Sequence, residues 1–380
     1  MKSLKVIITL TFLILFSFKT FAQIPLSDSA SISLLTCGPG DELYSVFGHT
    51  AIRIHDPANN MDTVFNFGSF DFDTPNFYLK FVKGNLQYFV SVDSYNDFVY
   101  TYKYYNRDIF EQTLNLSQNQ KQQIADELIS RLSSDKKFYT YKFIDRNCTT
   151  MVSDIISMYT EKISLKNEDS GKTYREIIYS YLYQEHFYEN LGINLMFGAK
   201  TDKELDKLFL PKQLLEGIDN TQTSNGKLSQ PPITVYKQHK EQKGVLFWNS
   251  YYSFAIIIAL LLLLSKNKTL QYTILTISAL LGVLFCANGL YSLHKELLYN
   301  YNILLFSPLF LILVFITNKK FERLLVYLHF VFIITYLIIT ISKPHFILML
   351  PFVVLLATVL LRILSKNKTE RKLTLAENAN

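Results

Sequence analysis

Five apolar stretches follow one another in the last third of this sequence, and they constrain its fold more than any other feature. They cover approximately residues 247–265, 270–293, 301–317, 324–342 and 345–364. A helix of roughly 20 apolar residues crosses the roughly 30 Å hydrocarbon core of a bilayer, where only helices and closed barrels satisfy their backbone hydrogen bonds. The stretches therefore predict an all-α region of five transmembrane helices over 247–365.

The loops between these stretches alternate in charge. Basic side chains follow the first, third and fifth stretches, at Lys266, Lys268, Lys319, Lys320, Arg323, Arg362, Lys366, Lys368, Arg371 and Lys372. Because cytoplasmic loops carry an excess of Lys and Arg, we expect these ends and the basic tail 366–380 to be cytoplasmic. The loops around His294 and Lys343 then lie outside the cytoplasm, together with all of 23–246.

The N-terminus supports the same orientation. A short basic start precedes an apolar run from Val6 to Phe18, and small residues lead to Ala22. This pattern predicts a signal peptide over 1–22. The alternative is an uncleaved anchor, but under either interpretation the segment that follows is exported.

Charge and cysteine content exclude two classes of protein. Residues 23–246 carry 23 basic against 28 acidic side chains, whereas 247–380 carry 12 against 4, so the net charge of +6 does not belong to one basic domain. A nucleic-acid-binding protein needs Lys and Arg clustered on a folded surface, so nucleic acid is excluded as a main partner. Three cysteines cannot form a disulfide framework, although a single bridge between Cys37 and Cys148 stays possible.

Residues 23–218 form the predicted exported domain, and the polar segment 219–246 is its predicted linker to the membrane helices. Alternating residues predict strands over 46–55 and 63–70, with further strands near 86–92 and 109–116. Ser117 and Thr201 each begin a capping-box pattern that predicts a helix. We therefore expect an α+β domain, with a small antiparallel sheet and helices packed on one side.

The most informative segment for chemistry lies around Cys148. Apolar residues at helical spacing follow it, so a helix is predicted to begin near Cys148 with Asp145 or Asn147 as its cap. A thiol at a helix N-terminus has a lowered pKa and is a candidate nucleophile. The alternative is that this cysteine is a small buried hydrophobic residue.

A thiolate nucleophile needs a base, and His49, which follows Gly48 at the head of a predicted strand, is the most suggestive histidine. If 56–59 is the hairpin turn, His49 pairs with Asn66, whose amide oxygen could hold one imidazole nitrogen. That gives a Cys-His-Asn arrangement. A register shift of two residues would instead place Gly68 opposite His49 and leave Asp71 as the orienting residue.

The roles of several other residues have more than one interpretation. Cys37 and Cys286 are expected to be packing residues. His294, Glu296 and Asn302 lie in or beside a short outward loop, where they are either loop residues that reach toward water or part of a site at the bilayer surface.

Several long motifs resemble one known family. The segments Leu35–Arg53, Val64–Phe72 and Pro75–Phe81, followed by Asp145-Arg-Asn-Cys-Thr-Thr150, resemble the Lnb-type periplasmic domain, and Asn302–Pro308 extends the resemblance into the apolar half. The resemblance implies a papain-like, circularly permuted NlpC/P60-like fold in the exported domain. Carried over to matching positions, it implies that Cys148 is the nucleophile and His49 the base.

The resemblance also implies an activity. Members of this family are lipoprotein N-acyltransferases of the Gram-negative inner membrane. The expected reaction moves an acyl chain from a phospholipid, through a Cys148 thioester, to the α-amine of a diacylglyceryl-cysteine lipoprotein, with no metal or other cofactor. The alternatives are a membrane-tethered cysteine amidase that cleaves cell-wall peptides, and a non-enzymatic protein in which Cys148 is inert.

Overall fold

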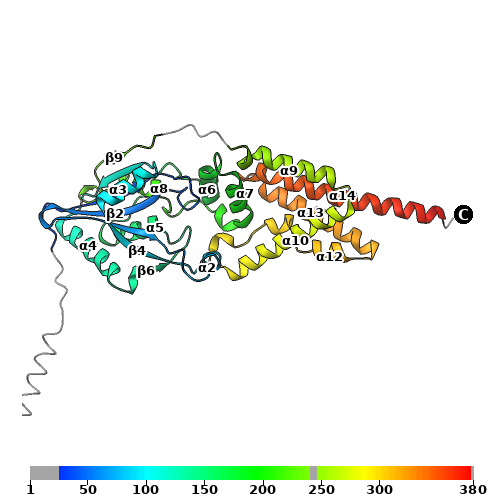
Figure 1. The fold of residues 1–380 in the computed structure, drawn as a ribbon, viewed down its shortest axis with the longest axis horizontal. Coiled ribbons are helices and arrows are strands. Elements are labelled where there is room, and N and C mark those ends of the chain that lie inside the picture. Colours follow the sequence, from blue (N-terminus) through cyan, green and yellow to red (C-terminus); the bar gives the residue numbers. More distant parts are fainter. Residues whose placement is uncertain (1–24, 240–245, 378–380) are drawn as a thin grey trace, which may run out of the picture.

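The computed structural model describes residues 25–239 and 246–377, with side chains described as far as Ser365. The predicted signal peptide, 1–22, lies outside the described residues. Figure 1 shows an N-terminal domain of strands and helices, followed by a bundle of helices that extends away from it.

The N-terminal domain is built on one antiparallel sheet in which the strands have the order β6-β4-β3-β2-β1-β5-β9. The strands are β1 (Ser31–Cys37), β2 (His49–Asp56), β3 (Met61–Ser69), β4 (Gln87–Ser94), β5 (Ile109–Thr113), β6 (Phe138–Thr140) and β9 (Ile233–Tyr236). The four strands predicted from alternation correspond to β2 to β5. The sheet is larger than the predicted one because β1, β6 and β9 are also paired with it.

Helices cover both faces of this sheet, which corrects the expectation that they pack on one side. The helices of the domain are α2 (Phe77–Lys83), α3 (Tyr95–Tyr104), α4 (Gln118–Leu132), α5 (Cys148–Tyr159), α6 (Tyr174–Leu182), α7 (Phe187–Met196) and α8 (Pro211–Asp219). On one face, α4, α5 and α8 bury the alternate strand residues Ile52 and Ile54 in the main core. On the other face, α3 packs Phe98 against Ala51 and Val64.

The register of the β2–β3 hairpin differs from the predicted one by two residues. Ala51 pairs with Asn66, so that His49 lies opposite Gly68 when the register is continued. The turn is made by residues 57–60 and not by 56–59, because Asp56 is the last buried strand residue and Asn60 adopts the left-handed conformation with φ of 51°.

Two further predictions about elements are corrected. The capping-box pattern at Thr201 does not begin an α-helix: Thr201 Oγ1 donates a hydrogen bond to the Gly198 carbonyl, and Glu204 forms a β-bridge with Thr173. Part of the predicted linker 219–246 is also ordered. It forms the small hairpin β7 (Gln222–Thr223) and β8 (Gly226–Lys227), and then β9, which pairs with β5 at the edge of the sheet.

The helical region contains the five predicted apolar segments, but not five full-length helices. Its elements are α9 (Tyr251–Leu264), α10 (Lys268–Tyr291), α11 (Asn302–Leu305), α12 (Phe310–Phe315), α13 (Lys319–Thr340) and α14 (Phe346–Glu377). Three of the described helices, α10, α13 and α14, are long and apolar enough to cross a membrane. The segment predicted at 301–317 is broken between α11 and α12, where Pro308 lacks a backbone N–H and the Phe306 carbonyl lies against Gly282 of α10.

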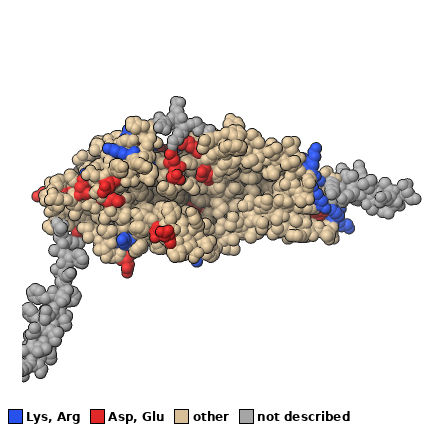
Figure 2. All heavy atoms as spheres, viewed as in Figure 1, with Lys and Arg blue, Asp and Glu red and all other residues tan. Residues whose placement is uncertain are grey.

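Charged side chains are separated along the long axis of the molecule. Figure 2 shows acidic side chains with some basic ones over the N-terminal domain, a broad band with few charges, and mainly basic side chains gathered at the far end of the helical region. That end holds the connection from α9 to α10, with Lys266 and Lys268, and the start of α13, with Lys319 and Lys320. The loops around His294 and Lys343 lie at the opposite end, against the N-terminal domain.

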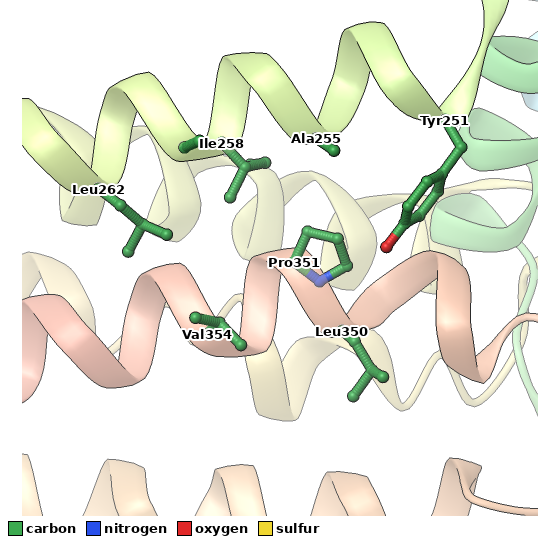
Figure 3. Close-up of a pocket in the computed structure, with 8 residues that line it drawn as sticks. Tyr251, Ala255, Ile258, Leu262, Leu350, Pro351 and Val354 are labelled. Carbon is green, nitrogen blue, oxygen red and sulfur yellow. The ribbon is translucent and has the colours of Figure 1, made fainter.

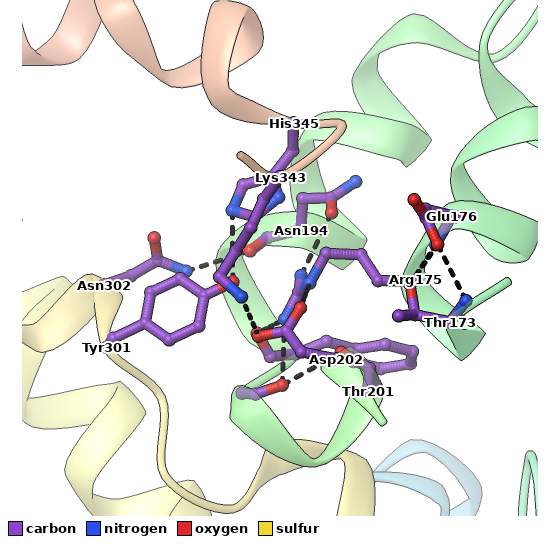
Figure 4. A network of polar contacts seen from close by, with 12 residues as sticks. Thr173, Arg175, Glu176, Asn194, Thr201, Asp202, Tyr301, Asn302, Lys343 and His345 are labelled. Atoms are coloured by element: carbon purple, nitrogen blue, oxygen red, sulfur yellow. Dashed lines mark hydrogen bonds and ion pairs between the residues drawn. The ribbon is translucent and has the colours of Figure 1, made fainter. Parts of the chain in front are cut away.

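A buried polar network joins the two parts of the chain (Figure 4). Arg175 of α6 donates to Asp202 at 2.6 Å, to Asn194 at 3.1 Å, and to the Phe197 and Gly198 carbonyls. Lys343, from the loop between α13 and α14, forms an ion pair with Asp202 at 2.8 Å. The N-terminal domain is therefore held to the helical region by buried charge pairs.

Candidate active site

The Cys148 side chain lies at the first position of α5. Asn147 caps this helix: its side chain accepts the Thr150 N–H at 3.0 Å, and Thr150 Oγ1 accepts the Asn147 N–H at 2.9 Å. Of the two predicted caps, Asn147 is therefore the one used, while Asp145 pairs with Lys207 and Lys295. The predicted helix start at Cys148 is confirmed.

Opposing effects set the pKa of the Cys148 thiol. Burial raises the pKa, but the charge of His49 and its hydrogen bond to the sulfur lower it, as do hydrogen bonds from the Thr50 backbone and the Thr149 hydroxyl. The charge of His49 and these hydrogen bonds outweigh the effect of burial, so the pKa of the Cys148 thiol is below its ordinary value. The sulfur thus shows the electrostatic character of a reactive thiol.

His49 is the first residue of β2, and its ring lies in a narrow space. A Cβ added at Gly68 would come within 2.5 Å of the His49 ring carbon Cε1, so the ring lies directly over this glycine. Tyr102 of α3 stacks on the imidazole with 6.1 Å between ring centroids. The preceding Gly48 has φ of +86°, and a Cβ there would come within 2.6 Å of the Cys37 carbonyl. Glycine at 48 and 68 therefore permits the position of the imidazole.

Asn66 holds the imidazole despite the shift in register. Its Oδ1 hydrogen-bonds His49 Nε2, and its Nδ2 donates to Asp93 Oδ2 at 2.9 Å. Asn66 lies opposite Ala51 and so reaches His49 diagonally across the same sheet face. Because Nε2 donates its hydrogen to Asn66 Oδ1, Nδ1 is the ring nitrogen that remains available to the Cys148 sulfur. The alternative orienting residue, Asp71, instead accepts the Asp73 N–H at 2.8 Å.

Three residues of this arrangement were not predicted from the sequence as site residues. Asp93 accepts a hydrogen bond from the Asn66 amide, Tyr102 stacks on the imidazole, and Gly68 leaves room for the ring. Only Gly68 left a signal, since the alternative register placed it opposite His49. Asp93 and Tyr102 lie in segments whose position over the site depends on the order of the strands.

The other cysteines take different places. Cys37 pairs with His49 across β1 and β2, is buried and is a free thiol, so no bridge joins it to Cys148. Burial raises the pKa of Cys37, which keeps it protonated. Cys286 belongs to α10 and is also free.

The loop 292–298 contacts the segment that leads into Cys148. Glu296 Oε1 accepts the Ile144 N–H at 2.9 Å, and Lys295 pairs with Asp145 at 3.2 Å. His294 Nε2 lies 2.9 Å from the Phe81 carbonyl, where the tautomer decides whether it donates. Asn302 lies in the network that joins the two parts, where it donates to the Asn194 carbonyl at 2.9 Å. Of His294, Glu296 and Asn302, Glu296 therefore makes the contact that lies closest in the sequence to Cys148.

Two features of the described residues bear on ligands. No group of three or more His, Cys, Asp and Glu side chains among them is placed to hold a metal ion.

A hollow of about 230 Å³ lies between α9 and α14, lined by apolar side chains and by Pro351 within α14 (Figure 3). This hollow is separate from the residues around Cys148.

These observations define a membrane protein whose N-terminal α/β domain brings a thiol, an imidazole and an amide together at one end of a sheet. Residues 18–181 match the family described as the Lnb N-terminal periplasmic domain. The family supports a lipoprotein-modifying enzyme with a periplasmic domain. Comparison with curated proteins and with solved structures gave no match.

Proposed function

We propose that this protein is a lipoprotein N-acyltransferase of the inner membrane that uses Cys148 as its nucleophile. The observation that carries the proposal is the thiol of lowered pKa at the start of α5, paired with an imidazole that Asn66 holds. The family match and the three candidate membrane spans favour a substrate that resides in a bilayer.

In the first half of the reaction, the Cys148 thiolate attacks an ester carbonyl of a phospholipid. The tetrahedral intermediate collapses when the carbon–oxygen bond to the glycerol breaks. The protonated His49 gives its proton to the departing oxygen, so that lysophospholipid leaves and a Cys148 thioester remains. Asn66 keeps the imidazole in the orientation that this proton transfer requires.

In the second half, the free α-amine of a diacylglyceryl-cysteine lipoprotein attacks the thioester carbonyl. The neutral His49 takes a proton from the attacking amine, the carbon–sulfur bond breaks, and the sulfur departs as the thiolate. The products are an amide on the lipoprotein and the starting Cys148–His49 pair. No external oxidant or nucleotide enters the balance.

The oxyanion of both intermediates needs hydrogen-bond donors. The first N–H groups of a helix have no partner within the helix, and those of Cys148 and Thr149 stand at the start of α5. The Asn147 side chain already serves the Thr150 N–H. We therefore assign the Cys148 N–H, with that of Thr149, as donors to the oxyanion.

The proposal is tested by mass spectrometry of lipoprotein N-termini from cells that carry the wild-type protein, Cys148→Ala or the control Cys286→Ala. We expect triacylated termini with the wild type and with Cys286→Ala, and diacylated termini with Cys148→Ala. Triacylated termini in the Cys148→Ala cells would reject the transferase. Altered cell-wall peptides with unaltered lipoproteins would favour a cysteine amidase instead.

A further inference from the structure

The short helix α2 exposes apolar side chains to an unusual extent. Tyr78 is 75% exposed, Leu79 69% and Val82 42%, and none of the residues of α2 is buried. Phe72, just before this helix, is 60% exposed. Isolated apolar residues on a surface are ordinary, but a contiguous apolar patch marks a surface that meets a partner or a membrane.

Hydrogen bonds tie α2 to the end of a candidate membrane span. Ser292 Oγ donates to the Val82 carbonyl at 2.7 Å, and the Leu293 N–H donates to the Lys83 carbonyl at 2.8 Å. Both donors directly follow α10, which ends at Tyr291 and is one of the three helices able to cross a membrane. Figure 1 shows α2 beside the end of α10, at the border between the N-terminal domain and the helical bundle. The helix α2 is therefore held beside the end of α10.

The residues around this border are of the types found at membrane interfaces. Tyr291 is 58% exposed and Leu293 56%, so the apolar surface continues from α2 onto the end of α10. Lys83 places its Nζ 5.0 Å from the centre of the Tyr291 ring. Tyrosine rings gather at the level of lipid headgroups, and lysine side chains extend along apolar surface while their charge stays in water.

An aromatic series leads from α2 toward Cys148. Phe77 of α2 contacts Phe70 with 5.9 Å between ring centroids, Phe70 contacts Tyr88 at 5.0 Å, and Tyr88 stacks on Tyr141 at 4.3 Å. Tyr88 packs against the same core as Cys148. Burial, and then the nearby Cys148, raise the pKa of Tyr88. The aromatic series thus connects the exposed helix with the surroundings of the sulfur.

We propose that Phe72, Tyr78, Leu79 and Val82, together with Tyr291 and Leu293, form a surface that enters the outer leaflet of the membrane and guides a phospholipid acyl chain along the aromatic series to Cys148. The occupant of this surface is the lipid leaflet itself. Its position at the end of α10 and its continuity with that helix favour lipid over a protein partner. The delivery of the acyl chain rests on the proposed function, whereas the contact with the leaflet does not.

The first experiment measures contact with lipid and needs no activity. The chain has one tryptophan, Trp248, so Trp248→Phe provides a background in which Leu79→Trp is the single reporter. The full-length protein is placed in vesicles of phosphatidylcholine and phosphatidylglycerol with or without brominated acyl chains. Tyr100→Trp is the matched control, because Tyr100 is 70% exposed and belongs to α3, which lies away from α2 and from the helical bundle in Figure 1.

We expect bromine to quench the tryptophan fluorescence of the Leu79→Trp variant at least twofold more than that of the Tyr100→Trp variant, both with Cys148 intact and with Cys148→Ala. Equal quenching of the two variants in vesicles that contain no other protein would overturn the contact with lipid. A surface that binds a protein partner gives this negative result.

The second experiment measures delivery. In vesicles that contain a labelled phospholipid and a diacylated lipopeptide, we expect Leu79→Asp to lower the initial rate of acyl transfer at least tenfold, and Tyr100→Asp to leave it unchanged. Circular dichroism confirms that both variants are folded. An unchanged rate in Leu79→Asp would overturn the guiding role. If the wild-type protein transfers no acyl chain, the proposed function fails while the quenching result still decides the contact.

Discussion

The pKa of the Cys148 thiol is controlled by groups from two separate segments, the start of β2 and the start of α5. Burial favours the neutral thiol, and the imidazole of His49 with the donors at Thr50 and Thr149 favours the thiolate. Because the electrostatic effects depend on His49 remaining close, the reactivity of the sulfur reports directly on the position of the imidazole.

This balance predicts the pH dependence of alkylation. A lowered pKa means that the wild-type thiolate persists below pH of about 8.5, the ordinary pKa of cysteine. The midpoint of iodoacetamide labelling at Cys148 should therefore lie below that pH, and it should move above it in His49→Ala, where burial remains without its opposing charge. Peptide mass spectrometry across a pH series measures both midpoints.

Cys37 serves as the control in the same samples. It is buried and its pKa is raised, so we expect little labelling of Cys37 at any pH at which the protein is folded. Labelling of Cys37 as fast as Cys148 would contradict the assignment of Cys148 as the reactive thiol.

Asn66 gives a second prediction for a single residue. Without its amide, the imidazole loses a partner at Nε2, so Asn66→Ala should lower kcat roughly tenfold or more, which is part of the roughly 10² to 10⁴ that general acid–base catalysis contributes in full. KM for the phospholipid should change little, since Asn66 is assigned no contact with the lipid. Steady-state kinetics in vesicles separates the two constants.

The matched variant is Asn225→Ala, in the exposed hairpin between β7 and β8. It should retain the wild-type kcat. A rise in KM with constant kcat in Asn66→Ala would indicate that Asn66 binds substrate and does not orient His49.

The sequence could predict Cys148, His49 and Asn66 because each leaves a local signal: a helix cap, a glycine before a strand, and a polar residue on the facing strand. It could not predict Asp93. This carboxylate reaches Asn66 only because β4 pairs with β3, and the order of strands in a sheet depends on packing across the whole domain.

Among the secondary-structure elements, the β2–β3 hairpin determines how much room the imidazole has. Gly68 does not have positive φ, so alanine is compatible with its backbone, but a Cβ would come within 2.5 Å of His49 Cε1. We therefore expect Gly68→Ala to remain folded and to lose most of its acyl transfer, because the ring must move from the sulfur. Transfer rates and thermal unfolding measure the two effects.

Gly192→Ala is the control for this prediction. A Cβ at Gly192 of α7 meets no atom within 4 Å, so activity should be unchanged, and stability should increase slightly since alanine favours helix. Full activity of Gly68→Ala would show that the imidazole is not confined as described.

The loop 292–298 supports the segment that precedes α5 through a hydrogen bond and an ion pair. A hydrogen bond to a charged group contributes about 1.5–3 kcal/mol, and Glu296 provides such a bond to the Ile144 N–H. We expect Glu296→Ala to lower acyl transfer roughly tenfold, because the segment that carries Asn147 and Cys148 loses this support. Glu296→Gln keeps an oxygen acceptor and should restore most of the rate.

The register of the hairpin shows why prediction of elements succeeds where prediction of pairing does not. Alternation placed the two strands, but the pairing depends on whether the turn starts at Asp56 or at Pro57. Ser27, far away in the sequence, hydrogen-bonds the Asp56 carboxylate through its N–H at 2.9 Å and so holds Asp56 within the strand. No local pattern contains that contact.

In the whole molecule, the network around Arg175 joins the periplasmic domain to the helical region. Removing one partner of a buried ion pair costs about 3–5 kcal/mol, and Arg175 is buried with its side chain only 2% exposed. Because Asp202 keeps Lys343 as a partner, we expect Arg175→Leu to destabilise the detergent-solubilised protein by about 3 kcal/mol. Thermal unfolding should then separate into two transitions, one for each part.

Lys203→Ala breaks an exposed ion pair with Asp206 and provides the comparison. Exposed pairs contribute about 0–1 kcal/mol, so one transition at nearly the wild-type temperature is expected. A single unshifted transition in Arg175→Leu would mean that the network does not couple the two parts.

For the whole molecule, the sequence predicted that an apolar helical region is present, but it did not predict the lengths of the helices in that region. Hydropathy identified all five apolar segments, yet only α10, α13 and α14 among the described helices reach spanning length. The break between α11 and α12 depends on the contact of the Phe306 carbonyl with Gly282, and the position of β9 depends on its pairing with β5. Both involve partners distant in the sequence.

The position of β9 has a consequence for biogenesis. This strand closes the edge of the sheet beside β5, yet it is synthesised only shortly before α9. While the chain is secreted, β5 remains an open edge until nearly all of the periplasmic part has been translocated, and open edges can pair with other chains. Completion of the sheet and insertion of the helical region must therefore follow each other closely in time, so a delay at this stage would favour aggregation in the periplasm.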